Sequence, residues 1–173
     1  MERSVKSGFS LVEILIVVVI VGILAAVLAP QFTGTGESAR YMSTVDTLKG
    51  LRSEIELYRN QHHGHWPGVT GADPDIVFAE QMTLPTNAAG ERSKAANQGF
   101  GDPNYPLGPY LPNVVPPNLF NSSRRVRTVA KFPSSPSGGG SVRDVGWIYE
   151  ITSGRIRINY DGICPAGQNY WEL

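Results

Sequence analysis

The sequence predicts an α+β fold in which a long N-terminal helix, half membrane-embedded and half amphipathic, packs against a small antiparallel β-sheet. Three observations predict it: an apolar run followed by a helical repeat, a middle rich in glycine and proline, and alternating apolar residues only near the C-terminus. The overall composition, with 41% hydrophobic residues and 15 basic against 15 acidic side chains, averages these unlike parts. Without a surplus of positive charge, nucleic acid is not expected as the main partner.

The first half of the predicted helix covers residues 9–30. Residues 14–29 read ILIVVVIVGILAAVLA, sixteen positions with nothing more polar than Gly22. Extended back to Phe9, a helix of this run is about 31 Å long at about 1.5 Å per residue, which matches the ~30 Å hydrocarbon core of a bilayer. Because the run is apolar on all sides, it indicates a membrane helix rather than a helix of a soluble core.

Three kinds of segment share this pattern: a cleaved secretory signal, an ordinary signal anchor and a more specialised membrane helix. A secretory signal is disfavoured because large residues occupy the small positions expected at a cleavage site after the run. An ordinary anchor is disfavoured because Glu13 places a carboxylate inside the apolar run. Such a buried charge costs several kcal/mol, so Glu13 is predicted to have a function and a partner.

The segment KSGFSLVEILIVVVIVGILAAVLAPQF resembles the N-terminus of the type IV pilin superfamily, which includes pilins and the pseudopilins of type II secretion. The resemblance rests on a short basic leader ending in Gly8, then Phe9, Glu13, Gly22 and Pro30. A later stretch that begins GPYL at residue 108 is similar to one typical of type II secretion pseudopilins. The chain is therefore most like a major pseudopilin with a type IV pilin-like fold.

The resemblance implies a leader peptide at 1–8, cleavage between Gly8 and Phe9 by a prepilin peptidase, and N-methylation of Phe9. It also implies that Glu13 pairs with the new amino group of a neighbouring subunit, an assembly role that competes with simple snorkelling of the side chain to the interface. Gly22 and Pro30 are expected to kink the helix, with Pro30 bending or melting it as it leaves the bilayer.

The function implied by the resemblance is that of a non-enzymatic structural subunit of a type II secretion pseudopilus. The expected partners are further copies of the chain in a helical homopolymer, prepilin peptidase, an inner-membrane assembly platform and minor pseudopilins. The expected location is the bacterial inner membrane, single-pass, with the N-terminus cytoplasmic and the head periplasmic, and the periplasm after assembly. The alternatives are a type IV pilin for adhesion, motility or DNA uptake, and a membrane-anchored binding module that does not polymerise.

The amphipathic half of the stem is predicted over residues 31–62. The repeat at intervals of three and four runs through Tyr41, Val45, Leu48, Leu51 or Arg52, Ile55 and Tyr58. Gly64 and the following Trp66-Pro67 pair indicate the end of the helix. The three histidines of the chain cluster at this end; they are interpreted as solvated residues rather than metal ligands, because no carboxylate lies near them: His62, His63 and His65.

Residues 63–173 are predicted to form the head. Residues 63–124 are loop-rich, with a short helix or a turn at 75–82, and the sheet is expected at 125–173. Its strand candidates are residues 125–132, 145–151 and 155–160, with a hairpin turn at Thr152-Ser153-Gly154 between the last two.

No catalytic motif or cofactor-binding motif is recognised, so no enzyme activity, cofactor or metal site is predicted. Cys164 is the single cysteine and is expected to be packed rather than reactive. Major pseudopilins often hold Ca²⁺ near the C-terminal sheet. Asp102, Asp144 and Asp161 could supply oxygen ligands here, but their spacing matches no calcium loop.

Overall fold

The computed structural model describes residues 10–28, 35–93, 101–136 and 144–173. The chain divides into two compact units, residues 1–39 and residues 40–173. The first unit contains α1, Leu11–Leu28. The helix α2, Thr35–Gln61, begins at the end of the first unit and contributes most of its length to the second.

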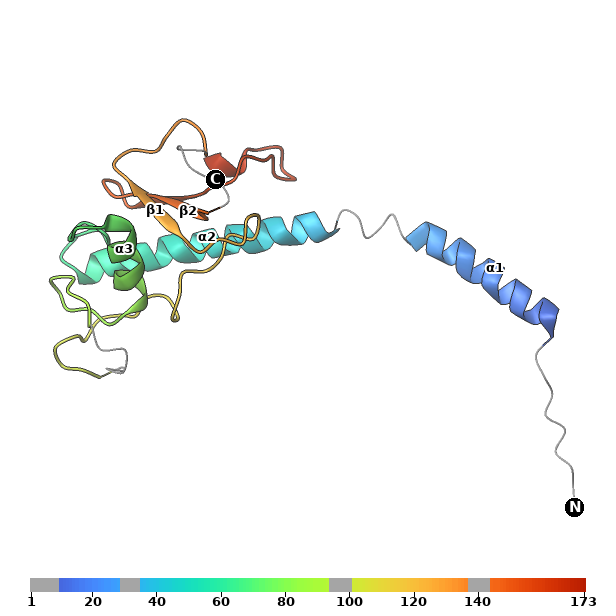
Figure 1. The fold of residues 1–173 in the computed structure, drawn as a ribbon, viewed down its shortest axis with the longest axis horizontal. Helices are drawn as coiled ribbons and strands as arrows, with labels where there is room; N and C mark the ends of the chain where they lie inside the picture. The colour runs from blue at the N-terminus through green and yellow to red at the C-terminus, as the bar shows by residue number, and fades with distance from the viewer. Residues whose placement is uncertain (1–9, 29–34, 94–100, 137–143) are drawn as a thin grey trace, which may run out of the picture. The chain divides into compact units, whose positions relative to one another are not determined.

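The second unit contains the remaining elements (Figure 1). They are α3, Pro74–Thr83, the strands β1, Val126–Val129, β2, Trp147–Glu150, and β3, Arg155–Ile158, and a final 3₁₀ turn, Tyr170–Glu172. The sequence left a short helix or a turn open at 75–82, and the structure forms the helix, α3. It begins at Pro74, which suits the first turn of a helix, and Asp73 caps it by accepting hydrogen bonds from the N–H groups of Asp75 and Ile76.

The three strands form one sheet in the order β1-β2-β3. All three lie within the predicted segments, and Gly154, with φ +70°, lies in the predicted turn between β2 and β3. The expectation of a wholly antiparallel sheet is wrong, because β1 pairs parallel to β2 while β2 and β3 are antiparallel. Residues 130–146 separate β1 from β2, which is long enough for the crossover that a parallel pair requires.

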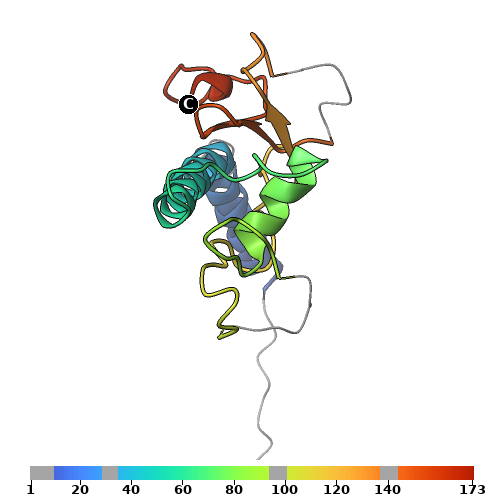
Figure 2. The same cartoon turned by 90° about the vertical axis from the view of Figure 1, so that its left-hand side faces the viewer.

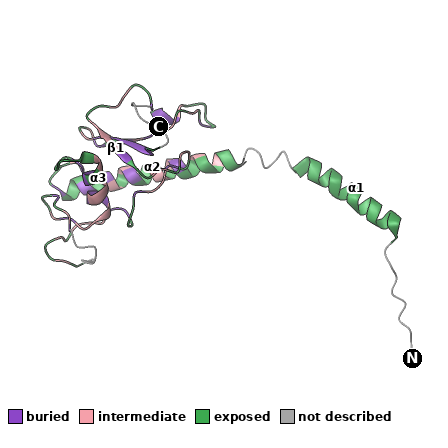
Figure 3. Cartoon of the chain, viewed as in Figure 1, coloured by how far each residue is buried: buried purple, intermediate pink, exposed green. Residues whose placement is uncertain are grey.

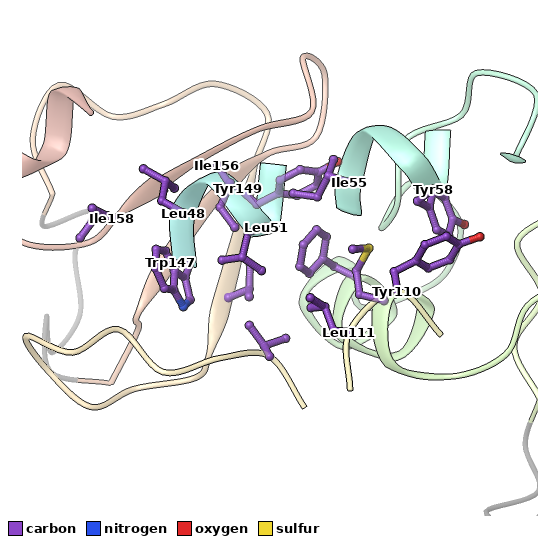
Figure 4. Packing of buried hydrophobic residues seen from close by; sticks show 14 of the residues in the cluster. Leu48, Leu51, Ile55, Tyr58, Tyr110, Leu111, Trp147, Tyr149, Ile156 and Ile158 are labelled. Atoms are coloured by element: carbon purple, nitrogen blue, oxygen red, sulfur yellow. The ribbon is translucent and has the colours of Figure 1, made fainter. Parts of the chain in front are cut away.

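One face of the sheet packs on α2 and α3 (Figure 2). Alternate residues of β2 and β3 face these helices, so Trp147, Tyr149, Ile156 and Ile158 are all fully buried (Figure 4). The opposite face carries a smaller cluster in which Ile148 packs with Val145 and with Trp171 of the final turn. The predicted α+β architecture is therefore confirmed, with side chains packed on both faces of a mixed sheet.

The buried stripe of α2 follows the predicted helical repeat closely. Leu48, Leu51, Ile55 and Tyr58 are each 2% exposed or less. At the N-terminal end, Thr44 is buried whereas Val45 is only half-buried, because the three-four repeat continued back from Leu48 falls on position 44.

The outer edge of β1 contacts α3 through a side chain. The Asp75 carboxylate accepts hydrogen bonds from the backbone N–H of Thr128 at 2.6 Å and from its hydroxyl at 2.5 Å. The N–H of Thr128 points away from β2, because alternate residues of a strand pair to opposite sides. Asp75 therefore occupies a backbone donor that would otherwise lie open at the sheet edge.

Candidate functional site

The candidate site lies on α1, an eighteen-residue helix in which no residue is buried (Figure 3). Its large apolar side chains are between 49% and 83% exposed on every side. With a mean hydropathy of 3.2, it is the one helix among the described residues long and apolar enough to cross a membrane. Such a surface is not stable in water, so lipid or other protein chains must cover it.

Glu13 is the acidic residue in the first turn of α1. Its carboxylate accepts a long hydrogen bond of 3.4 Å from the backbone N–H of Ser10, and its own N–H donates to the Ser10 carbonyl at 3.1 Å. The bond to the Glu13 carboxylate is the glutamate half of a capping box, whereas the bond to the Ser10 carbonyl is a backbone bond of the first turn. A negative charge is also favourable at a helix N-terminus. Sequence reasoning missed this capping role, although serine followed three positions later by glutamate is its usual signature.

The remaining predicted residues of the N-terminal site stay predictions. Gly8, Phe9 and Pro30 lie outside the described residues. Gly22 lies within α1, which is helical on both sides of it, and a methyl group added there would meet no atom within 4 Å.

The histidines at the end of α2 do not share one environment. His63 and His65 are exposed as expected, but the expectation of a solvated His62 is wrong, because this residue is only 1% exposed. Its ring stacks on Tyr58 with a centroid separation of 3.7 Å. The reason is positional: His62 lies four residues after Tyr58 and continues the buried stripe of α2 by one more turn.

Both ring nitrogens of His62 have partners. Nδ1 lies 2.8 Å from the Tyr58 carbonyl oxygen and Nε2 lies 3.0 Å from the Thr86 hydroxyl. Since a carbonyl can only accept, Nδ1 carries the proton and Nε2 accepts from Thr86 in the neutral ring. Burial lowers the pKa of His62 by penalising the charged form. With both nitrogens bonded within the fold, the ring packs as part of the core.

The structure does not bring the carboxylates that the sequence offered as possible calcium ligands, Asp102, Asp144 and Asp161, together into a cluster of three. No three Asp, Glu, His or Cys side chains converge among the described residues, and Asp102 caps its own turn by accepting from the Asn104 N–H at 2.8 Å. The loop before β2 is held by carboxamides instead. Asn118 donates to the Gly146 carbonyl, and the Val145 carbonyl accepts from both Asn121 and Asn159.

Glu150 at the end of β2 is the most strongly perturbed carboxylate of the head. It is 5% exposed, accepts hydrogen bonds from the Ser153 hydroxyl and the Phe132 N–H, and forms an ion pair with Arg155 at 3.0 Å. These hydrogen bonds, that from Ser153 first, outweigh the effect of burial and lower the pKa of Glu150 to about 2. Its partners Ser153 and Arg155 lie in and after the turn between β2 and β3, so this cluster stabilises the hairpin.

The chain is similar to known proteins, and one match covers the segment that contains α1. Residues 3–29 match the family described as the prokaryotic N-terminal methylation motif. The chain is 34% identical over 84 residues to the type II secretion system core protein G of Escherichia coli, which covers 49% of this chain and 56% of that protein. It is 39% identical over 67 residues to a fimbrial protein of Neisseria meningitidis, covering 38% of each.

The chain is a homologue of core protein G and of type IV pilins. A second core protein G, from Pseudomonas aeruginosa, is 37% identical over 59 residues, which is 34% of this chain and 42% of that protein. The matches thus span about half the length of these relatives. No solved structure matches the chain.

The methylation-motif match contains the whole of α1, which is the helix among the described residues that is long and apolar enough to cross a membrane. These relatives are described as a type II secretion system core protein and a fimbrial protein.

Proposed function

We propose that this chain is a structural subunit of a type II secretion pseudopilus, anchored in the inner membrane before assembly and polymerised through α1. The observation that carries the proposal is the exposed apolar surface of α1 with a carboxylate in its first turn. A bilayer covers this surface before assembly, and the α1 helices of neighbouring subunits cover it in the filament.

Processing comes first. A prepilin peptidase cleaves between Gly8 and Phe9 at the cytoplasmic side and N-methylates Phe9, and the motif match over residues 3–29 contains both positions. Arg3 and Lys6 of the leader favour retention of the N-terminus in the cytoplasm, which leaves the head in the periplasm. Residues 9–30 then remain as the anchor, with residues 31–62 as the stem and 63–173 as the head.

Assembly follows from the cost of an isolated charge in the membrane. Glu13 pairs with the methylated amino group of Phe9 in the neighbouring subunit, and burying the two charges together is far less unfavourable than burying either alone. The pair therefore favours assembled over dispersed subunits. The assembly platform of the inner membrane and minor pseudopilins are the further partners that this function requires.

Glu13→Gln is the sharpest test, because glutamine can still cap the first turn of α1 but carries no charge. We expect Glu13→Gln and Glu13→Ala to be cleaved and methylated normally, as read by mass spectrometry, and to form no filaments in electron micrographs. Glu37→Gln, in the first turn of α2, is the matched control and should form filaments normally. Normal filament yield from Glu13→Gln would refute the role of the charge.

The pilin alternative rests on the homology to fimbrial proteins. Deleting the gene separates the two: loss of protein export with surface pili intact supports the pseudopilin, and loss of surface pili with export intact supports the pilin. A wild-type chain that is processed but never forms filaments would instead be a membrane-anchored binding module.

A further inference from the structure

A surface groove of about 510 Å³ lies between α3 and the start of β1. Its apolar lining includes Ile76 of α3, Val114 and Val115 of the preceding loop, and Val126 of β1. Ile76 and Val114 are 54% and 47% exposed, so this lining is wet in the isolated chain. An apolar group bound there would remove both side chains from water.

The acidic side chains around the groove have partners within the chain, whereas, in the described part of the chain, the basic ones form no ion pair. On the α3 side there are three carboxylates: Asp73 caps α3, Asp75 accepts from Thr128, and Glu80 pairs with Arg92 at 2.8 Å. On the opposite side, Arg124 and Arg125 are exposed and form no ion pair with any described residue. The groove therefore offers an apolar floor beside two available cations, which suits an apolar side chain with a carboxylate close to it.

One exposed loop of the head carries both an apolar side chain and a carboxylate. Ile163 is 70% exposed, the highest value of any large apolar side chain in residues 40–173 that the structure describes, and Asp161 is exposed two residues before it. We call residues 161–163 the knob. The knob is firmly held: the N–H of Cys164 donates to the Gln168 carbonyl at 2.7 Å, and the N–H of Tyr170 donates to the Gly162 carbonyl at 2.9 Å.

Burial fixes the base of the same loop. Cys164 is 3% exposed and Tyr170 is 1% exposed, while Tyr160 stacks on Phe120 with ring centroids 4.4 Å apart. An isoleucine held outward on an anchored loop loses little conformational entropy when it binds, which favours a role in recognition.

We infer that the knob of one subunit docks into the groove of a second copy of this chain, with Ile163 on the apolar floor and Asp161 beside Arg124 and Arg125. This inference rests on the proposed function, since it describes how heads meet in a filament. The C-terminal segment and α3 occupy different parts of the head in both views (Figures 1 and 2), so each subunit presents a knob at one place and a groove at another. Such a head-to-tail contact does not complete itself in a two-fold dimer and propagates into an open polymer.

The test compares filament yields from the full-length chain, measured by shearing and electron microscopy in cells that assemble the wild type. Ile163→Ser is expected to lower the yield about tenfold, as expected for a central contact residue. Asp161→Arg and the double variant Arg124→Asp/Arg125→Asp should each lower it, and combining all three changes should restore it. Val69→Ser, another exposed apolar residue, and Lys131→Asp, another exposed cation, are the matched controls and should assemble normally.

Circular dichroism of each variant in detergent verifies that it is folded, so that a lost filament reports a lost contact. If the knob and groove variants assemble like the controls, the docking is refuted and the proposed function stands. If the charge variants fail and the combination does not recover, the pairing of Asp161 with the arginines is refuted. If no cell that processes the wild-type chain assembles it into filaments, this comparison has no starting point, and the proposed function and this inference fall together.

Discussion

The helices α1 and α2 share a backbone geometry but differ in how their apolar side chains are covered. In α1 no side chain is buried and apolar residues cover every side, whereas α2 buries one stripe and exposes the rest. The buried stripe of α2 is covered within the chain by apolar side chains of the sheet and α3 (Figure 4). The apolar side chains of α1 are exposed on every side, so the same substitution has different consequences in the two helices.

The largest difference is expected for truncation of a core residue. Ile55→Ala removes a side chain that is 0% exposed in the α2 stripe, and we expect it to lower the free energy of unfolding of the head by about 2–5 kcal/mol. Val18→Ala in α1 and Leu57→Ala on the exposed side of α2 are the controls. Urea unfolding followed by tryptophan fluorescence measures all three, and equal losses would contradict the distinction between the helices.

Acid should weaken the head and leave α1 helical. The pKa of Glu150 is lowered to about 2 in the folded chain against an ordinary value of 4.5, so its stabilising contribution is complete above pH 4.5 and is lost as the pH falls towards 2. The shift corresponds to about 3 kcal/mol. Melting curves recorded between pH 6 and pH 2 should show this loss in the wild type and a flatter profile in Glu150→Gln.

Protonation of His62 at the end of α2 should lower the stability of the head at a higher pH than protonation of Glu150. Since burial lowers the pKa of His62 below its ordinary 6.5, the unfolded chain binds the proton more readily, and head stability falls as the pH drops below 6.5. His62→Gln should abolish this part of the pH dependence, while His63→Gln, at an exposed position, should retain it. An unchanged profile in His62→Gln would show that the ring does not control stability in this range.

The smallest expected effect is a gain. Gly50 lies in the middle of α2 with no atom within 4 Å of an added methyl group, so Gly50→Ala should stabilise the head by about 1 kcal/mol through helix propensity alone. Gly22→Ala in α1 has the same open space but should not change unfolding of the head. A destabilised Gly50→Ala would indicate a neighbour that the isolated chain does not contain.

The sequence predicted those parts of the fold that depend on local pattern. The three-four repeat identified Leu48, Ile55 and Tyr58 as buried and left Leu51 and Arg52 as alternatives, of which Leu51 is the buried one. Alternation identified Ile156 and Ile158. Strand direction was not predictable, because the parallel pairing of β1 depends on the path of residues 130–146 and not on the residues of β1 itself. His62 was misjudged since a polar residue at a helix end usually faces solvent, and only its spacing from Tyr58 indicates otherwise.

The functional features also include one that the sequence indicated and one that it did not. Glu13 stood out in the sequence because a carboxylate in an apolar run is costly wherever the chain goes. The groove lined by Ile76, Val114 and Val126 had no signal, because its walls come from segments far apart in the sequence and acquire meaning only when folded.

The contact between Asp75 and Thr128 has a consequence if the chain polymerises as proposed, because copies of the head then lie close together. Strand edges with free N–H groups recruit one another, and crowded copies would be exposed to edge-to-edge aggregation. Asp75 fills the N–H of Thr128 at the outer edge of β1 and places a carboxylate where a second strand would have to lie. One aspartate thus helps to keep crowded copies soluble, so that heads can meet through side chains without fusing into a continuous sheet.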